Sequence, residues 1–157
     1  VERSSIRDLT LYVGSDMRLW PGKTYADPLR EFSHELDLVT YLTGKPCVTD
    51  AVFTPTGLYQ IDGTHRRGRW TVRIAPFHSP AGRWVEVRTA DGQVLRYDWD
   101  VDPVTVQSMY RAQAAQLANA AGPDDLLCPL RSGLQTTVMV DAIEIRLDMK
   151  EALCPVM

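Results

Sequence analysis

The chain has 157 residues, 45% of them hydrophobic and 24% charged, which is enough for one globular domain with a buried core. Its formal net charge of −3 argues against a general nucleic-acid binder, because neutralising phosphates requires a basic surface. The three widely separated cysteines predict a reduced, cytoplasmic protein, and no cysteine–histidine spacing predicts a metal site. We therefore expect a single domain over residues 1–157 with no nucleic-acid or membrane partner.

The first part of the chain predicts a strand, a loop and a helix. Alternating apolar residues predict the strand over 6–14. A loop is expected over 15–26, and Asp27–Pro28 is typical of a helix start, with an N-cap followed by proline. The helix should extend to about Thr43, because Gly44 follows as a stop signal. Helical spacing places one stripe on this helix, formed by Phe32, Leu36, Val39 and Thr43, and an adjoining one, formed by His34, Leu38, Tyr41 and Leu42.

The middle of the chain predicts a meander of short strands separated by turn residues. The expected strands cover 48–54, 57–63, 69–77, 83–90 and 93–99. Asp91–Gly92 lies between the last two and predicts a hairpin with a type I′ turn, because aspartate and glycine tolerate positive φ angles.

Alternation within the last two strands predicts how their side chains divide between the faces of the sheet. Val85, Val87 and Thr89 are expected to face the helices. The opposite face would be partly aromatic, being either wet or covered by another subunit. Its aromatic residues are expected to be Trp84, Tyr97 and Trp99.

Two helices are predicted at the end of the chain. The first is expected over 102–121, and Ser132–Gln135 has the form of a capping box that starts the second. The second helix has a continuous apolar stripe, formed by Leu134, Val138, Ala142, Ile145, Met149 and Ala152. The order of elements predicts an α+β fold, an open antiparallel or mixed sheet with helices packed on one face.

Two neighbouring motifs carry a resemblance to a known enzyme family. Trp20-Pro-Gly-x-x-Tyr25 precedes Ser33-His-Glu-Leu-Asp37, and the helix closes with Tyr41-Leu-x-Gly44. This arrangement resembles the C-terminal substrate and oligomerisation domain of the Gfo/Idh/MocA oxidoreductases. The resemblance implies a nicotinamide-binding Rossmann domain, but the sequence lacks the Gly-x-Gly-x-x-Gly turn of such a domain. We therefore expect no cofactor-binding residues on this chain, with NAD or NADP held by a Rossmann partner if one exists.

The same resemblance implies a set of site residues. His34 takes the position of the family's substrate-facing histidine, which hydrogen-bonds a sugar hydroxyl and can relay its proton. Glu31, one helical turn earlier, is its expected acidic partner. The implied substrate-binding residues are Trp20, Lys23, Tyr25 and Asp37. A structural interpretation stays open, in which His34 is a half-buried helix residue and Asp37 its local partner. Two departures from the family are a shortened loop before Phe32 and an arginine, Arg30, at a position where other members have aspartate.

Two functional hypotheses follow. In the first, the chain is the substrate-binding and oligomerisation domain of an NAD(P)-dependent, sugar-type oxidoreductase, and is an enzyme only together with a Rossmann domain or subunit. In the second, it is a free-standing, non-redox descendant that binds a small polar ligand, scaffolds a partner, or transfers a proton through His34 and Glu31. Both include a homo-oligomer formed through the open face of the sheet.

Overall fold

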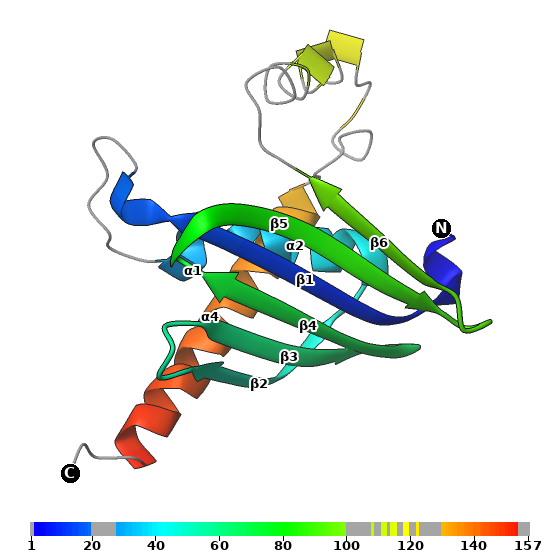
Figure 1. The fold of residues 1–157 in the computed structure, drawn as a ribbon. Coiled ribbons are helices and arrows are strands. Elements are labelled where there is room, and N and C mark those ends of the chain that lie inside the picture. The colour runs from blue at the N-terminus through cyan, green and yellow to red at the C-terminus, as the bar shows by residue number, and fades with distance from the viewer. Residues whose placement is uncertain are drawn as a thin grey trace.

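The fold is an α+β arrangement, with a mixed six-stranded sheet that carries helices on one face (Figure 1). It is seen in a computed structural model that describes residues 2–19, 28–99 and 130–153 and scattered positions between 108 and 122. The strand order is β2-β3-β4-β1-β5-β6. The predicted fold class is confirmed.

The elements have the following bounds. The strands are β1 (Ile6–Asp16), β2 (Cys47–Phe53), β3 (Tyr59–His65), β4 (Gly68–Ala75), β5 (Phe77–Thr89) and β6 (Val94–Trp99). The helices are α1 (Pro28–Glu31), α2 (Ser33–Thr43) and α4 (Leu130–Leu153), with short 3-10 turns η1 (Arg3–Ser5) and η2 (Met17–Leu19). The helix predicted over 102–121 falls largely outside the described residues, although Ser108 and Asn119 within it are helical.

The first strand lies in the middle of the sheet, which corrects the predicted meander. β1 pairs in parallel with β4 and antiparallel with β5. Only the flanking pieces, β2 to β4 and β5 to β6, are antiparallel runs of consecutive strands. Alternating hydrophobicity identifies strands but does not order them, and the rule that neighbours in sequence pair in the sheet fails between β4 and β5.

The predicted β5–β6 hairpin is present, but its turn is not type I′. Gly92 has a φ of +86°, and no other type of residue in the described part of the chain has a positive φ. A type I′ turn requires positive φ at both central residues, so Asp91 excludes it. The amide of Thr89 donates to the carbonyl of Gln93, and that of Gly92 donates to the carbonyl of Thr89. The result is a longer loop that closes with a left-handed glycine.

The predicted helix over 28–43 is broken into α1 and α2 at Phe32. The backbone of Phe32 has a ψ of 20°, which departs from helical values, while its side chain is buried in the core. The predicted end is confirmed, because α2 stops at Thr43 and Gly44 adopts a φ of +87°. The amide of Gly44 donates to the carbonyl of Thr40 at 2.9 Å, as in a glycine-terminated helix.

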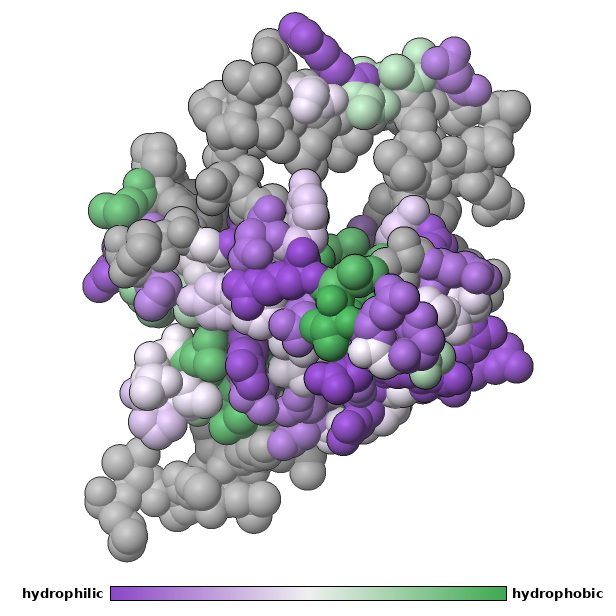
Figure 2. All heavy atoms as spheres, turned by 45° about the vertical axis from the view of Figure 1, so that its right-hand side comes forward, coloured by the Kyte–Doolittle hydropathy of each residue, from purple (hydrophilic) through white to green (hydrophobic). Residues whose placement is uncertain are grey.

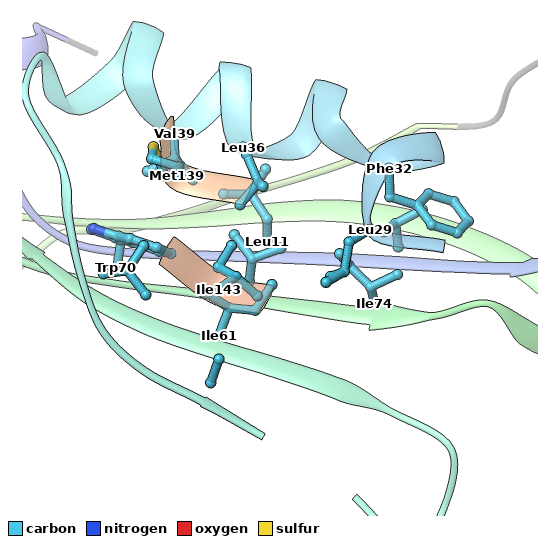
Figure 3. Packing of buried hydrophobic residues seen from close by; sticks show 14 of the residues in the cluster. Leu11, Leu29, Phe32, Leu36, Val39, Ile61, Trp70, Ile74, Met139 and Ile143 are labelled. Carbon is cyan, nitrogen blue, oxygen red and sulfur yellow. The ribbon is translucent and has the colours of Figure 1, made fainter. Parts of the chain in front are cut away.

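The core lies between the sheet and helices α2 and α4 (Figure 3). In the close view, the side chain of Leu36 points from α2 toward Leu11 of the sheet, and Val39 lies beside Met139 of α4. Gly63 of β3 is required here, because a Cβ atom at its position would stand 2.2 Å from the Trp70 ring. The apolar face of α2 is therefore buried in a core that it shares with the sheet and α4.

Helix α4 packs mainly on a different side from the predicted stripe, although Ala142 of that stripe is partly buried against the core. It begins at Leu130, so Ser132 lies inside the helix and is not its N-cap. Leu134, Val138 and Ile145 of the predicted stripe are 65%, 59% and 58% exposed. The buried residues of α4 are Thr136, Met139, Val140 and Ile143. Contacts with α2 and β2 select this side, because α4 carries apolar residues on more than one side of its axis.

The aromatic residues predicted for the open face are divided between the two faces. Cross-strand partners share a face, and Trp84 pairs with Asp98 whereas Tyr97 pairs with Val85. Tyr97 therefore lies on the helix side. Trp99 pairs with Arg83 through the backbone, and its side chain falls outside the described part of the chain. The predicted register of β6 against β5 is one residue away from the observed one. A shift of one residue moves every side chain of the strand to the opposite face of the sheet. Strongly hydrophilic residues cover much of the described surface in the view of Figure 2.

Candidate functional site

A cleft lies where the N-terminal part of α2 meets the first turns of α4. Its volume is about 290 Å³. Residues from the α1–α2 segment form one wall, and residues from α4, about 100 positions later, form the other. The lining residues are Arg30, Ser33, His34, Asp37, Gly133, Thr136, Thr137 and Val140.

His34 is an exposed residue that lines this cleft. The next two residues, Glu35 and Leu36, turn to the buried side of α2, which leaves His34 on the outer side. The alternative of a half-buried structural histidine therefore does not describe its surroundings. The resemblance assigned a ligand-binding role to this residue, and that role stays a prediction.

Asp37 links the two walls of the cleft. Its Oδ1 accepts a hydrogen bond of 2.9 Å from the hydroxyl of Thr136 on α4. Arg30 makes a second link, because its Nη2 donates to both carboxylate oxygens of Glu144 at 3.2 and 3.3 Å. Asp141 lies 4.0 Å from the same nitrogen. These polar contacts hold α4 beside α2 at the position where the cleft opens.

The other predicted site residues have different positions. Glu31 is exposed at the end of α1 and is not among the described residues that line the cleft. Trp20, Lys23 and Tyr25 lie outside the described residues. No motif marks the α4 wall in the sequence, because two adjacent threonines such as Thr136 and Thr137 are an ordinary feature of a helix.

The buried carboxyl next to the cleft faces the sheet. Burial raises the pKa of Glu35, an effect that the charge of Arg83 partly opposes. The Nε of Arg83 is 3.9 Å from Oε1 of Glu35, and the glutamate is only 6% exposed. Glu35 therefore belongs to the packing of α2 on the sheet, on a different side of the helix from His34.

The cleft has the chemistry of a site for a polar organic ligand. It offers an imidazole, hydroxyl groups of Ser33 and Thr137, and one carboxylate and one guanidinium that also tie its walls together. Such groups can donate and accept hydrogen bonds to hydroxyls. Within the described ranges no cluster of three His, Cys, Asp or Glu side chains could hold a metal ion. Nor does any helix in those ranges have the length and apolar character needed to cross a membrane.

Comparison with solved structures places this fold within known dehydrogenases. A dehydrogenase (MviM) from Clostridium difficile superposes on 90% of this chain with a TM-score of 0.66 and 7% sequence identity. A protein from Magnetospirillum magnetotacticum MS-1 that is assigned as an oxidoreductase superposes on 88% with a TM-score of 0.61 and 14% identity. The chain spans about half the length of these proteins, 55% and 54% respectively. No protein-family model matches the sequence, and a search of curated proteins finds no match.

At this level of identity the likeness establishes a shared fold. It agrees with the family resemblance that the motifs around His34 predict, and it shows that this fold forms part of larger dehydrogenase and oxidoreductase chains. Function has to be argued from the site, because one fold can serve many activities.

Proposed function

We propose that the chain is the substrate-binding domain of an NAD(P)-dependent, sugar-type oxidoreductase whose nucleotide-binding part lies elsewhere. The observation that carries this proposal is the position of His34, exposed on the wall of a polar cleft in a fold found within dehydrogenases. In this proposal the imidazole hydrogen-bonds a ligand hydroxyl and accepts its proton during oxidation. Ser33, Asp37 and Thr137 orient the remaining hydroxyls.

The described residues do not fit a dinucleotide. Pyrophosphate binding requires a glycine-rich turn between a strand and the N-terminus of a helix. The left-handed glycines in the described ranges are instead Gly44 at the end of α2, and Gly57 and Gly92 in strand-to-strand connections. We therefore expect no saturable binding of NAD or NADP to the isolated chain in calorimetry. Micromolar binding of either nucleotide would contradict the proposal that the cofactor is held by a separate Rossmann domain or subunit.

The ligand site is tested by titrating the chain with myo-inositol and D-glucose and following the backbone amide signals of the cleft residues Asp37 and Gly133 by NMR. His34→Asn should abolish the saturable shifts of these signals while leaving the melting temperature nearly unchanged, because the side chain is exposed. His78→Asn is the matched control, since His78 is also exposed but lies on β5 against Tyr12. A His34→Asn variant that binds both compounds as the unmodified chain does would end the functional assignment of this residue.

The proposal includes a homo-oligomer through the open face of the sheet. On this face Trp84 stacks on Tyr12 with ring centroids 5.7 Å apart, and the guanidinium of Arg96 lies 4.4 Å from the Trp84 ring. A second copy that covers this group would bury its exposed edges. Sedimentation should then show a dimer or larger species that Trp84→Arg dissociates. A monomer at high concentration, unchanged by this substitution, would exclude the interface.

A second candidate function is binding or proton transfer without redox chemistry. The missing dinucleotide turn of this sequence favours it, and its chemistry would use the same cleft, with Glu31 as the partner of His34. The intact mass of the polypeptide purified from its source separates the two candidates. A longer chain that includes a dinucleotide-binding segment, or a copurifying subunit with one, supports the oxidoreductase. A protein of this length that turns over its ligand without a nicotinamide supports the alternative.

A further inference from the structure

A second hollow lies on the open face of the sheet, opposite the helices. It has a volume of about 370 Å³ and extends over β1, β2, β3 and β4. The helical cleft is on the other side of the sheet, so the two spaces are separate. The polar residues that line the hollow are Asp8, Thr10, Thr49, Asp62, Thr64, Arg69 and Thr71.

Asp62 is held in a fixed orientation within this hollow. The hydroxyl of Thr71 donates to Oδ1 of Asp62 at 2.6 Å, and the side-chain amide of Gln60 donates to Oδ2 at 3.0 Å. Thr49 donates to its main-chain carbonyl at 3.1 Å. An ionised carboxylate has about four lone-pair positions, so these bonds orient Asp62 and leave it able to accept from a ligand.

Asp8 lies between two arginines at distances that are too long for hydrogen bonds. Its Oδ1 is 3.7 Å from Nε of Arg69, and its Oδ2 is 3.9 Å from Nε of Arg88. Charge attraction keeps the groups together, but N–H···O hydrogen bonds are typically about 2.7–3.2 Å long. A hydroxyl in the hollow can therefore accept from Arg69 and donate to Asp8 without breaking an existing hydrogen bond.

We propose that this hollow binds a neutral molecule with several hydroxyl groups, such as a polyol or a sugar, at a site independent of the helical cleft. Its lining combines acceptors, donors and threonine hydroxyls, which can do both, as adjacent hydroxyls of a ligand require. Two carboxylates and one guanidinium in the lining disfavour an anion. The volume falls in the range of small-molecule sites.

Backbone amides of two strands provide local reporters for the test. Thr64 of β3 and Thr71 of β4 both line the hollow. Titration with myo-inositol should shift the backbone amide signals of Thr64 and Thr71 in a saturable way. Asp62→Asn and Arg69→Gln should each weaken this titration at least about tenfold, the loss expected for a hydrogen bond to a charged group.

Two controls separate this site from its surroundings and from the cleft. Asp50 pairs with Asp62 across the strands but does not line the hollow. Asp50→Asn should therefore leave the titration unchanged. His34→Asn should also leave the titration of the hollow unchanged. Loss of binding at the helical cleft can therefore be told apart from loss of binding at the hollow. The proposal would be overturned by the absence of a saturable shift of the Thr64 and Thr71 amides. It would also be overturned if the Asp62→Asn and Arg69→Gln variants titrated as the unmodified chain does.

Discussion

Helices α2 and α4 lie on the same face of the sheet, but sequence periodicity identifies the buried side of only one of them. In α2 the predicted stripe is the buried one, with Leu36 and Val39 fully buried. In α4 the predicted stripe contains Leu134 and Ile145, which are exposed, while Ile143 is buried in their place. The two helices therefore show what a periodic pattern can and cannot determine.

The difference comes from how apolar residues are distributed around each helix. The outer side of α2 carries His34 and Asp37 beside the partly buried Leu38 and Leu42, so its most apolar direction is distinct. Along α4, aliphatic residues occur on two sides. The contacts that α4 makes with α2 and β2 then decide which side is buried. A helix with two apolar sides is oriented by its neighbours, and its own sequence leaves the choice open.

The largest expected effect tests this comparison within α4 itself. Ile143→Ala should lower the free energy of unfolding by about 2–5 kcal/mol, because it leaves a cavity in the core. Ile145→Ala, two residues later on the exposed side, should change it by no more than about 0.5 kcal/mol. Urea unfolding of both variants measures the difference. Equal losses would mean that the observed orientation of α4 is wrong.

Adjacent threonines sharpen the comparison where the two helices meet. The hydroxyl of Thr136 donates to Asp37 of α2, whereas that of Thr137 donates to Gly133 in its own helix at 3.1 Å. Thr136→Val should cost about 1–3 kcal/mol, because a partly buried carboxylate loses a donor. Thr137→Val should be close to neutral in the same unfolding experiment. If Thr137→Val costs as much as Thr136→Val, the bond between the helices does not stabilise the fold.

The buried side of α2 should also respond to pH through Glu35. Burial raises the pKa of this carboxyl above its ordinary value of 4.5, so its protonated form favours the folded state. Its contribution to stability is complete below pH 4.5 and is lost as the pH rises through the folded-state pKa. The stability of Glu35→Gln relative to the unmodified chain should therefore increase over that range. The attraction of Arg83 lowers the folded-state pKa of Glu35 and therefore reduces the size of this increase.

The measurement compares urea unfolding of the two proteins at a series of pH values. Glu86→Gln is the control, because Glu86 is a carboxylate of β5 on the open face. If the free energy of unfolding changed with pH in the same way for Glu35→Gln and the unmodified chain, burial would not raise the pKa of Glu35.

The smallest effect is expected at the start of α4. A Cβ atom at Gly133 would meet no atom within 4 Å, and its helical position gains from a residue with less backbone freedom. Gly133→Ala should therefore raise the free energy of unfolding by about 0.5–1 kcal/mol. Gly133→Leu should narrow the cleft that this residue lines, reducing ligand binding without loss of stability. Destabilisation by the alanine variant would show that the helix is strained at this point.

Local patterns in the sequence determine much of this fold. Alternation identified all six strands of the described sheet, and Gly44 correctly ended α2, because these signals depend on residues close in the chain. The position of β1 and the face of Tyr97 were wrong because they depend on pairing between distant segments. The break at Phe32 was also missed, since Phe32 lies on the same periodic stripe as Leu36 and Val39 and nothing in that pattern marks it.

The candidate site was partly predictable for the same reason. His34 and Asp37 belong to one short motif on one helix, and both line the cleft. The opposite wall comes from α4, whose approach to α2 depends on tertiary packing. Thr136 and Gly133 therefore had no signal of their own. Whether Trp20, Lys23 and Tyr25 take part stays a prediction.

The central position of β1 has a consequence for how the chain folds. The β2–β4 meander and the β5–β6 hairpin can each form from neighbouring residues, but β4 and β5 do not pair with each other. β1 joins them, and its partners lie roughly 60 to 80 positions later in the chain. High contact order slows folding, and until β5 has been made the apolar residues Leu9, Leu11 and Val13 have no completed sheet in which to be buried. Among the strands of the sheet, β1 therefore remains unpaired for the longest time during synthesis, and its apolar residues are the most exposed to aggregation. Removal of β1 would leave the β2–β4 and β5–β6 pieces without a strand that joins them.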